Sequence, residues 1–196
     1  PDAVRHVPVE GVVFTDAELD HTLGLALLRE GRKLAVWATP QVARILEEDS
    51  RLLTTTRAFA DVALHALAPG GPAVRLRYRD GAPSGLTVEA FVVAGDPPRF
   101  ARSVAPDEPG HTVGLVVRGA AGGTLAYVPG CSALDDAIVA RLAEADVVLV
   151  DGTFWRDDEL IALGVSSSRA ADMGHVPISG AGGSLARLAA LPSRPS

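Results

Sequence analysis

The chain has 196 residues, of which 47% are hydrophobic and 21% charged, and its formal net charge is −6. With a mean hydropathy of +0.22, this composition excludes a disordered chain and predicts one globular domain over residues 1–196, with an irregular tail at 192–196. The 18 basic residues are outnumbered by 24 acidic ones, which argues against a nucleic-acid partner. No apolar run approaches the roughly 20 residues that a membrane-spanning helix needs.

Cys131 is the only cysteine. A single thiol excludes an internal disulfide and any zinc site built from several cysteines. It is typical of a protein in a reducing compartment, so the sequence predicts a cytoplasmic location.

The first part of the chain alternates strand and helix patterns. The expected elements are a strand over Gly11–Thr15, a helix over Ala17–Glu30, a strand over Lys33–Thr39 and a helix over Gln41–Glu48, which Pro40 begins.

Hairpin patterns follow, and then helix and strand alternate again. We expect strands within Ala73–Ala94 around an Asp80–Gly85 turn, strands over Thr112–Arg118 and Thr124–Val128 around Gly119–Gly123, a helix over Leu134–Ala145, a fully buried strand over Asp146–Val150, and helices over Asp157–Leu163 and Ser184–Leu191. This order favours an α/β domain of two sheets with helices packed outside them.

Potential ligands are densest in Thr15-Asp16-Ala17-Glu18-Leu19-Asp20-His21, where the first strand meets the first helix. One interpretation is a metal site on the loop that follows a strand. The other is a helix cap, because Thr15 followed by Glu18 matches a capping box. Three carboxylates within one turn repel each other unless a cation neutralises them, and this favours the metal site.

The same segment resembles a known signature. Asp16-x-Glu18-x-Asp20-His21 is similar to the His-x-His-x-Asp-His motif of the metallo-β-lactamase superfamily, with its first two histidines replaced. Together with Tyr127-Val128-Pro129-Gly130, the 151–159 segment DGTFWRDDE and Met173-Gly174-His175, it resembles the PqqB family of pyrroloquinoline quinone (PQQ) biosynthesis.

The resemblance implies an αββα four-layer sandwich, incomplete in this chain. It also implies that Asp20 and His21 are metal ligands, and that Asp16 and Glu18 stand where the superfamily has its other two loop ligands. Because carboxylates replace imidazoles, the site favours iron as Fe²⁺, with zinc and manganese as alternatives.

Three functions follow from the resemblance. The first is an iron- and oxygen-dependent hydroxylase that acts on the tyrosine ring of a cross-linked Glu-Tyr precursor derived from the PqqA peptide. The second is a non-catalytic carrier that moves PQQ or its precursor towards the periplasm. The third is a residual metal-dependent hydrolase. In each case the partner is a small or peptide-derived molecule, and a homodimer is an open alternative to a monomer.

The family also implies segments beyond this chain. Its members carry an N-terminal section with a structural zinc site. They also continue into a C-terminal His-Ile-Asn-Asn-Thr-Asn-Pro segment, whose histidine is expected to complete the metal site. The chain is therefore expected to be a fragment of such a protein.

Two further residues are candidates for the site. Asp151 ends a predicted strand, and we expect it either to orient a ligand histidine or to cap its own turn. His175 lies in a loop punctuated by Gly174 and Pro177, which favours a catalytic role as proton donor or substrate anchor.

The remaining candidates have simpler interpretations beside the functional ones. His111 and Cys131 stand where zinc β-lactamases place a further His and Cys, but with the first two loop histidines replaced we expect a loop residue and a small buried thiol rather than ligands. Trp155 is expected in the core, with the wall of the pocket as the alternative. Arg169 is either a surface arginine or a partner for a substrate carboxylate. His6 and His65 are expected at the surface or its boundary.

Overall fold

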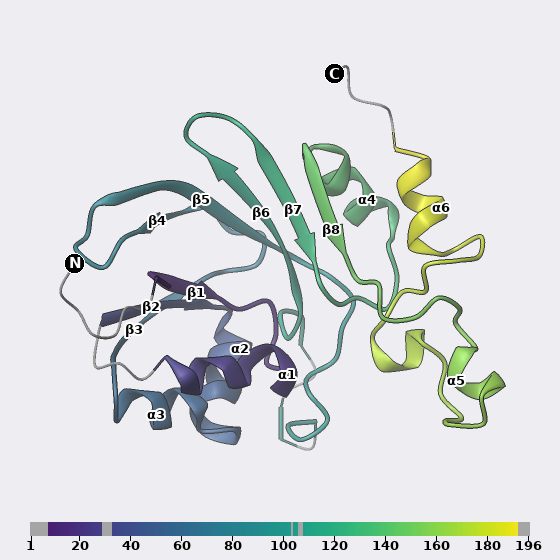
Figure 1. Cartoon of the computed structure of the whole chain (residues 1–196), viewed down its shortest axis with the longest axis horizontal. Coiled ribbons are helices and arrows are strands. Elements are labelled where there is room, and N and C mark those ends of the chain that lie inside the picture. Colours follow the sequence, from purple (N-terminus) through teal and green to yellow (C-terminus); the bar gives the residue numbers. More distant parts are fainter. Residues whose placement is uncertain (1–7, 29–32, 103, 106–107, 192–196) are drawn as a thin grey trace.

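A computed structural model describes residues 8–28, 33–102, 104–105 and 108–191. It contains two β-sheets with helices around them, as Figure 1 shows. The predicted α/β class with two sheets is therefore confirmed.

The first sheet is parallel and has three strands in the order β1 (Gly11–Val13), β2 (Lys33–Ala38) and β3 (Asp61–Ala66). The chain between β2 and β3 forms α2 (Pro40–Arg44), a π-helical turn η2 (Ile45–Asp49) and α3 (Leu52–Arg57). The hydroxyl of Thr39 caps α2 by accepting a 3.1 Å hydrogen bond from the Val42 amide. Ile45, Leu46 and Leu53 are fully buried against this sheet, so helices cover its outer face (Figure 1).

The second sheet has five strands in sequence order: β4 (Val74–Arg77), β5 (Pro83–Val92), β6 (Val113–Gly119), β7 (Thr124–Val128) and β8 (Val147–Val150). All neighbours are antiparallel except β7 and β8. The parallel pair needs a crossover, and α4 (Asp136–Ala143) supplies it. Asp135 caps α4 by accepting a 2.8 Å bond from the Ile138 amide.

Side chains that alternate along each strand divide the core into layers. Trp37, Val88, Ala90, Val113 and Leu115 meet between the two sheets. On the other face of the second sheet, Val116, Ala126 and Val128 pack with Ile138 and Leu142 of α4, and with the partly buried Leu188 of α6 (Ser184–Ala189). Each sheet therefore buries one face against the other sheet and one against helices.

One predicted element differs in its burial. β8 was expected to be fully buried, but Val147 is 55% and Leu149 is 50% exposed. Both lie on the inner face of the sheet, in register with Leu125 and Tyr127. The expectation was wrong because the residues of the inter-sheet cluster come from β2, β5, β6 and the loop after β3, and that cluster does not extend to β7 and β8.

Other element boundaries shifted. The helix expected over 17–30 is shorter and divides into α1 (Leu19–Thr22) and a 3₁₀ helix η1 (Leu23–Leu27), because Thr22 and Gly24 are poor helix formers; residues 29–30 lie outside the described residues. The last predicted helices are α5 (Glu159–Ala162) and α6, and a short η3 (Ala171–Met173) precedes His175. The predicted tail at 192–196 also lies outside the described residues.

Candidate functional site

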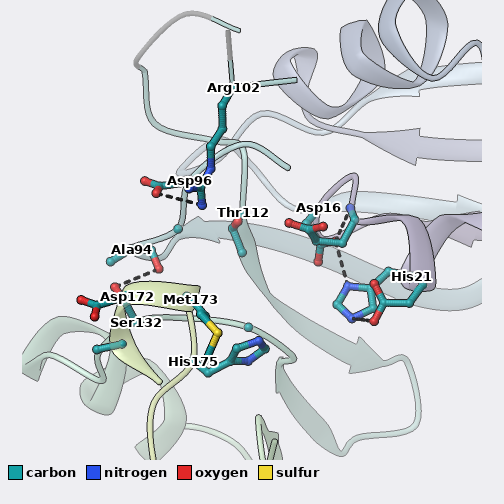
Figure 2. A pocket seen from close by; sticks show the side chains of 16 residues that line it. Asp16, His21, Ala94, Asp96, Arg102, Thr112, Ser132, Asp172, Met173 and His175 are labelled. Atoms are coloured by element: carbon teal, nitrogen blue, oxygen red, sulfur yellow. Dashed lines mark hydrogen bonds and ion pairs between the residues drawn. The ribbon is translucent and has the colours of Figure 1, made fainter. Parts of the chain in front are cut away.

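Four chain segments converge on a cavity of about 460 Å³ at one end of the two sheets (Figure 2). They are the loop after β1, the long loop between β5 and β6, the loop after β7, and the η3 segment. The amide of Val113 donates to the Thr15 carbonyl oxygen (2.9 Å) and the amide of Ser132 to that of Ala94 (3.0 Å), so backbone bonds tie these loops together. The residues that line the cavity are Asp16, Glu18, Asp20, His21, Ala94, Gly95, Asp96, Arg102, Thr112, Gly130, Ser132, Ala171, Asp172, Met173, Gly174 and His175.

Asp16 and His21 form the first element of the site. His21 Nδ1 lies 2.8 Å from Asp16 Oδ1, and Asp16 is almost fully buried. Its Oδ1 also accepts from the Glu18 amide, and its Oδ2 accepts from the Thr15 hydroxyl. A carboxylate acceptor favours the neutral tautomer that carries its proton on Nδ1 and leaves the Nε2 lone pair open. Asp16 therefore holds the His21 ring through Nδ1, and its candidacy as a metal ligand stays a prediction.

Glu18 and Asp20 are exposed, unlike Asp16. Asp20 Oδ2 lies 3.8 Å from His21 Nε2, so the two candidate ligands face the same space. Although Glu18 reaches solvent, partial removal of its carboxyl group from water and the neighbouring charges of Asp16 and Asp20 raise its pKa. Burial by itself would lower the pKa of the His21 imidazole. The neighbouring carboxylates have a larger combined effect, so the pKa is raised. The cluster is thus one that a proton or a cation stabilises.

The capping-box interpretation of this segment is wrong. The helix begins at Leu19, its N-cap position is Glu18, and no side chain caps it. Thr15 lies too early in the chain to reach the helix, and its hydroxyl donates to Asp16 instead (2.8 Å).

Asp151 and His175 repeat the same arrangement on the other wall. His175 Nδ1 lies 2.7 Å from Asp151 Oδ2, and the Asp151 side chain is only 2% exposed. Asp151 Oδ1 accepts from the amide and hydroxyl of Thr153, so Asp151 both orients a histidine and holds its own turn. Phe154 packs edge-on against the His175 ring at 5.5 Å. As in His21, the Nε2 lone pair is available for a substrate or a metal.

These residues fit a metal in part. Imidazoles held through Nδ1 by buried carboxylates are typical of metal ligands, and Asp20 with His21 offers the oxygen and nitrogen donors that iron accepts. Within the described residues, however, no group of three or more His, Cys, Asp or Glu side chains is close enough to hold a metal ion. A metal held by Asp20 and His21 would need at least one more donor.

His111 and Cys131 do not line the cavity. Both are buried, with about 1% of each residue exposed. Burial, with the nearby charge of Asp151, raises the pKa of the Cys131 thiol to about 11. The simpler interpretation, a small buried thiol and a buried loop histidine, agrees with these positions.

Three other expectations can be compared with the structure. Trp155 is 57% exposed, so the expectation that it lies in the core was wrong; α5 and its flanking turns project away from the sheets (Figure 1). Arg169 is exposed and pairs with Asp157 outside the cavity, at 2.9 Å. His65 stacks on Trp37 at a ring distance of 5.1 Å. His6 lies outside the described residues.

Sequence patterns did not indicate several residues of the cavity. Arg102 reaches it from the long loop between β5 and β6 (Figure 2). Gly95 packs so tightly on Thr112 that a Cβ would lie 2.5 Å from the threonine hydroxyl. Across the cavity, a Cβ at Gly130 would meet nothing within 4 Å, so the space beside this glycine is open. No helix in the described parts of the chain has the length and apolar character to cross a membrane.

Residues 1–194 match the family model described as "Beta-lactamase superfamily domain". A protein of Rhizobium meliloti named coenzyme PQQ synthesis protein B is 37% identical over 198 residues, which cover 96% of this chain and 60% of the relative. The protein of the same name from Cupriavidus taiwanensis is 41% identical over 197 residues, which cover 98% of this chain and 62% of that relative.

A solved structure is also similar. The crystal structure of Zn²⁺-bound PqqB from Methylobacterium extorquens superposes with a TM-score of 0.80 at 30% identity, covering 98% of this chain and 62% of that one. The chain therefore spans about 60% of the length of the relatives that it matches.

Proposed function

Because the chain belongs to the β-lactamase superfamily and is a homologue of coenzyme PQQ synthesis protein B, we propose that it acts in PQQ biosynthesis as an iron- and oxygen-dependent hydroxylase. The substrate is the cross-linked Glu-Tyr precursor derived from PqqA, and the bond that changes is an aromatic C–H of the tyrosine ring. One oxygen atom of O₂ enters the ring, while the other leaves as water with two electrons from a reductant and two protons.

The observation that carries the proposal is the pair of histidines, each held through Nδ1 by a buried aspartate and each lining one cavity. Asp20 and His21 would hold the iron, together with a donor from outside this pair. When bound, iron supplies the one-electron chemistry that O₂ needs to react with an aromatic ring.

The other residues bind and orient. Asp16 fixes the His21 ring, so that His21 Nε2 and the Asp20 carboxylate point into the same space. His175 lies on the other wall, where Nε2 can accept a hydrogen bond from the substrate phenol or take up its proton. Gly130 leaves open space beside Ser132 for a bulky ring.

The experiment that tests this proposal measures oxygen uptake by iron-loaded protein in the presence of the precursor and a reductant. The proposal predicts uptake that depends on the precursor, and its loss in Asp20→Ala and His21→Ala. Unchanged uptake in both variants would contradict the proposed site. Tight binding of PQQ by metal-free protein, together with a persistent lack of uptake, would instead select the carrier.

The residual hydrolase is a weaker candidate, because His111 and Cys131 lie outside the cavity lining. It requires cleavage of an ester or phosphodiester that His111→Ala abolishes. Cleavage of that kind by the wild-type protein would favour it over the hydroxylase.

A further inference from the structure

The cavity is strongly acidic. Five carboxylate side chains line it, namely Asp16, Glu18, Asp20, Asp96 and Asp172. Arg102 is the only arginine or lysine among the lining residues that the structure describes. A substrate that carries carboxylates of its own would be repelled by such a cavity unless a cation received it.

Arg102 is carried by a well-anchored turn. The amides of Ala101 and Arg102 both donate to the Pro98 carbonyl oxygen, at 2.8 and 3.1 Å. Ala101 is fully buried in the cluster beneath the first sheet, and the Arg102 Nε donates to the Pro97 carbonyl oxygen at 3.2 Å. The backbone and Nε are thus fixed, while the Nη groups extend over the cavity (Figure 2).

The carboxylate that now faces Arg102 is weakly held. Arg102 Nη2 lies 3.3 Å from Asp96 Oδ2, in a single contact between side chains that are 50% and 72% exposed. An exposed pair of this kind contributes only about 0–1 kcal/mol. A guanidinium prefers the two parallel bonds that an incoming carboxylate can offer.

Arg102 also faces the segment that carries the candidate metal ligands Asp20 and His21. Arg102 lines the same cavity as Glu18, Asp20 and His21. A ligand held by Arg102 would therefore lie between the β5–β6 loop and the Asp20–His21 pair, with η3 and His175 on the other side of the cavity (Figure 2).

We propose that Arg102 is the residue that selects an anionic substrate: it binds a substrate carboxylate, and Asp96 occupies its place when the cavity has no substrate. This inference rests on the proposed function for the identity of the substrate. The binding step itself requires only that the ligand carry a carboxylate.

The test compares Arg102→Gln, Arg102→Lys and Asp96→Asn with the wild-type protein, and uses Arg169→Gln as the matched control because that arginine lies outside the cavity. KM and kcat are measured with the precursor in iron-loaded protein, and binding to metal-free protein is measured by calorimetry. The same binding is repeated with an analogue in which the precursor carboxylates are amides.

Arg102→Gln should raise KM and weaken binding of the precursor about tenfold to a hundredfold, with kcat within about twofold of wild type, because charge-assisted bonds are lost. Arg102→Lys should recover part of the loss, and Asp96→Asn should lower KM by a few fold because the internal competitor is gone. The amide analogue should bind wild type and Arg102→Gln alike, and Arg169→Gln should match wild type throughout.

An unchanged KM in Arg102→Gln would overturn the inference, and so would an equal loss of affinity for the acid and the amide. The proposed function fails separately. If wild-type protein binds the precursor without oxygen uptake and Arg102→Gln loses that binding, the hydroxylase is contradicted while the role of Arg102 stands. If wild-type protein does not bind the precursor at all, both are contradicted, because the precursor itself carries the carboxylates that Arg102 is proposed to bind.

Discussion

Asp151 Oδ2 lies 2.7 Å from His175 Nδ1, across 24 residues of chain. The contact joins the end of β8 to the loop after η3, and an isolated β-bridge between Cys131 and His175 holds the same loop from its other side. His175 is thus positioned by backbone and side chain together. The equivalent relation between Asp16 and His21 spans only five residues, from the loop after β1 to the adjacent helix α1.

Removing the Asp151 carboxylate should affect stability and activity differently. Asp151→Ala leaves His175 Nδ1 and the Thr153 hydroxyl without their acceptor, and we expect the free energy of unfolding to fall by about 1–3 kcal/mol. Asp151→Asn keeps an acceptor and should unfold close to wild type, yet lose roughly tenfold in turnover because the imidazole is held less firmly. Chemical denaturation and oxygen uptake measure the two effects. Wild-type turnover in Asp151→Ala would show that His175 needs no orientation.

Asp16 should act through His21. Asp16→Asn weakens the hold on Nδ1, so affinity for Fe²⁺ or Zn²⁺ should fall by about 10- to 100-fold. Metal titration against a competing chelator measures this change. Asp136→Asn is the matched control, because the Asp136 side chain is 98% exposed on α4. An equal loss in both variants, or none in Asp16→Asn, would contradict the positioning role.

Cys131 should be unreactive while the protein is folded. With a pKa of about 11, only ~0.1% of the thiol is ionised at pH 8, and the thiolate is the reactive form. A thiol reagent such as DTNB should therefore label the protein only after denaturation. Because the folded pKa is raised, the thiol favours the folded state below its unfolded pKa, and this contribution is lost as pH rises towards 11. Rapid labelling of the native protein at pH 8 would be inconsistent with this burial.

Two glycines of the cavity wall form a steric test. Gly95→Ala places a Cβ 2.5 Å from the Thr112 hydroxyl. We expect this overpacking to lower the free energy of unfolding by about 1–3 kcal/mol. For a domain of this size, that loss lowers Tm by roughly 2–12 °C. Gly130→Ala meets nothing within 4 Å and should melt near wild type, with a higher KM if the substrate occupies that space. Equal melting temperatures would mean that the Gly95 loop is free to move.

Much of the fold could be predicted because its signals are local. The glycine-rich turn at 119–123 joins β6 and β7, and the helix expected over Leu134–Ala145 is present as α4. The ligand-dense loop after β1 does contribute to the cavity. By contrast, α3 and β3 were not predicted: α3 contains Thr54, Thr55 and Thr56, which are poor helix formers. The buried Thr56 hydroxyl finds its partner within the helix by donating to the Leu52 carbonyl oxygen at 2.8 Å.

The rest depends on contacts between distant segments. Nothing local distinguishes buried Asp16 from exposed Glu18 and Asp20, because their burial depends on how the loop turns against its neighbours. Arg102 enters the cavity only because the long β5–β6 loop folds back over it, and Arg169, which has the same chemistry, does not. Burial of β8 likewise depends on what covers its inner face and not on its apolar sequence.

The most direct test of the central claim is the fate of labelled oxygen. Iron-loaded protein is incubated with the cross-linked precursor, a reductant and ¹⁸O₂, and the product is measured by mass spectrometry. The account predicts one ¹⁸O atom on the tyrosine ring of the product, and loss of that product in His21→Ala. Unlabelled product, or labelled product formed equally well by His21→Ala, would contradict it.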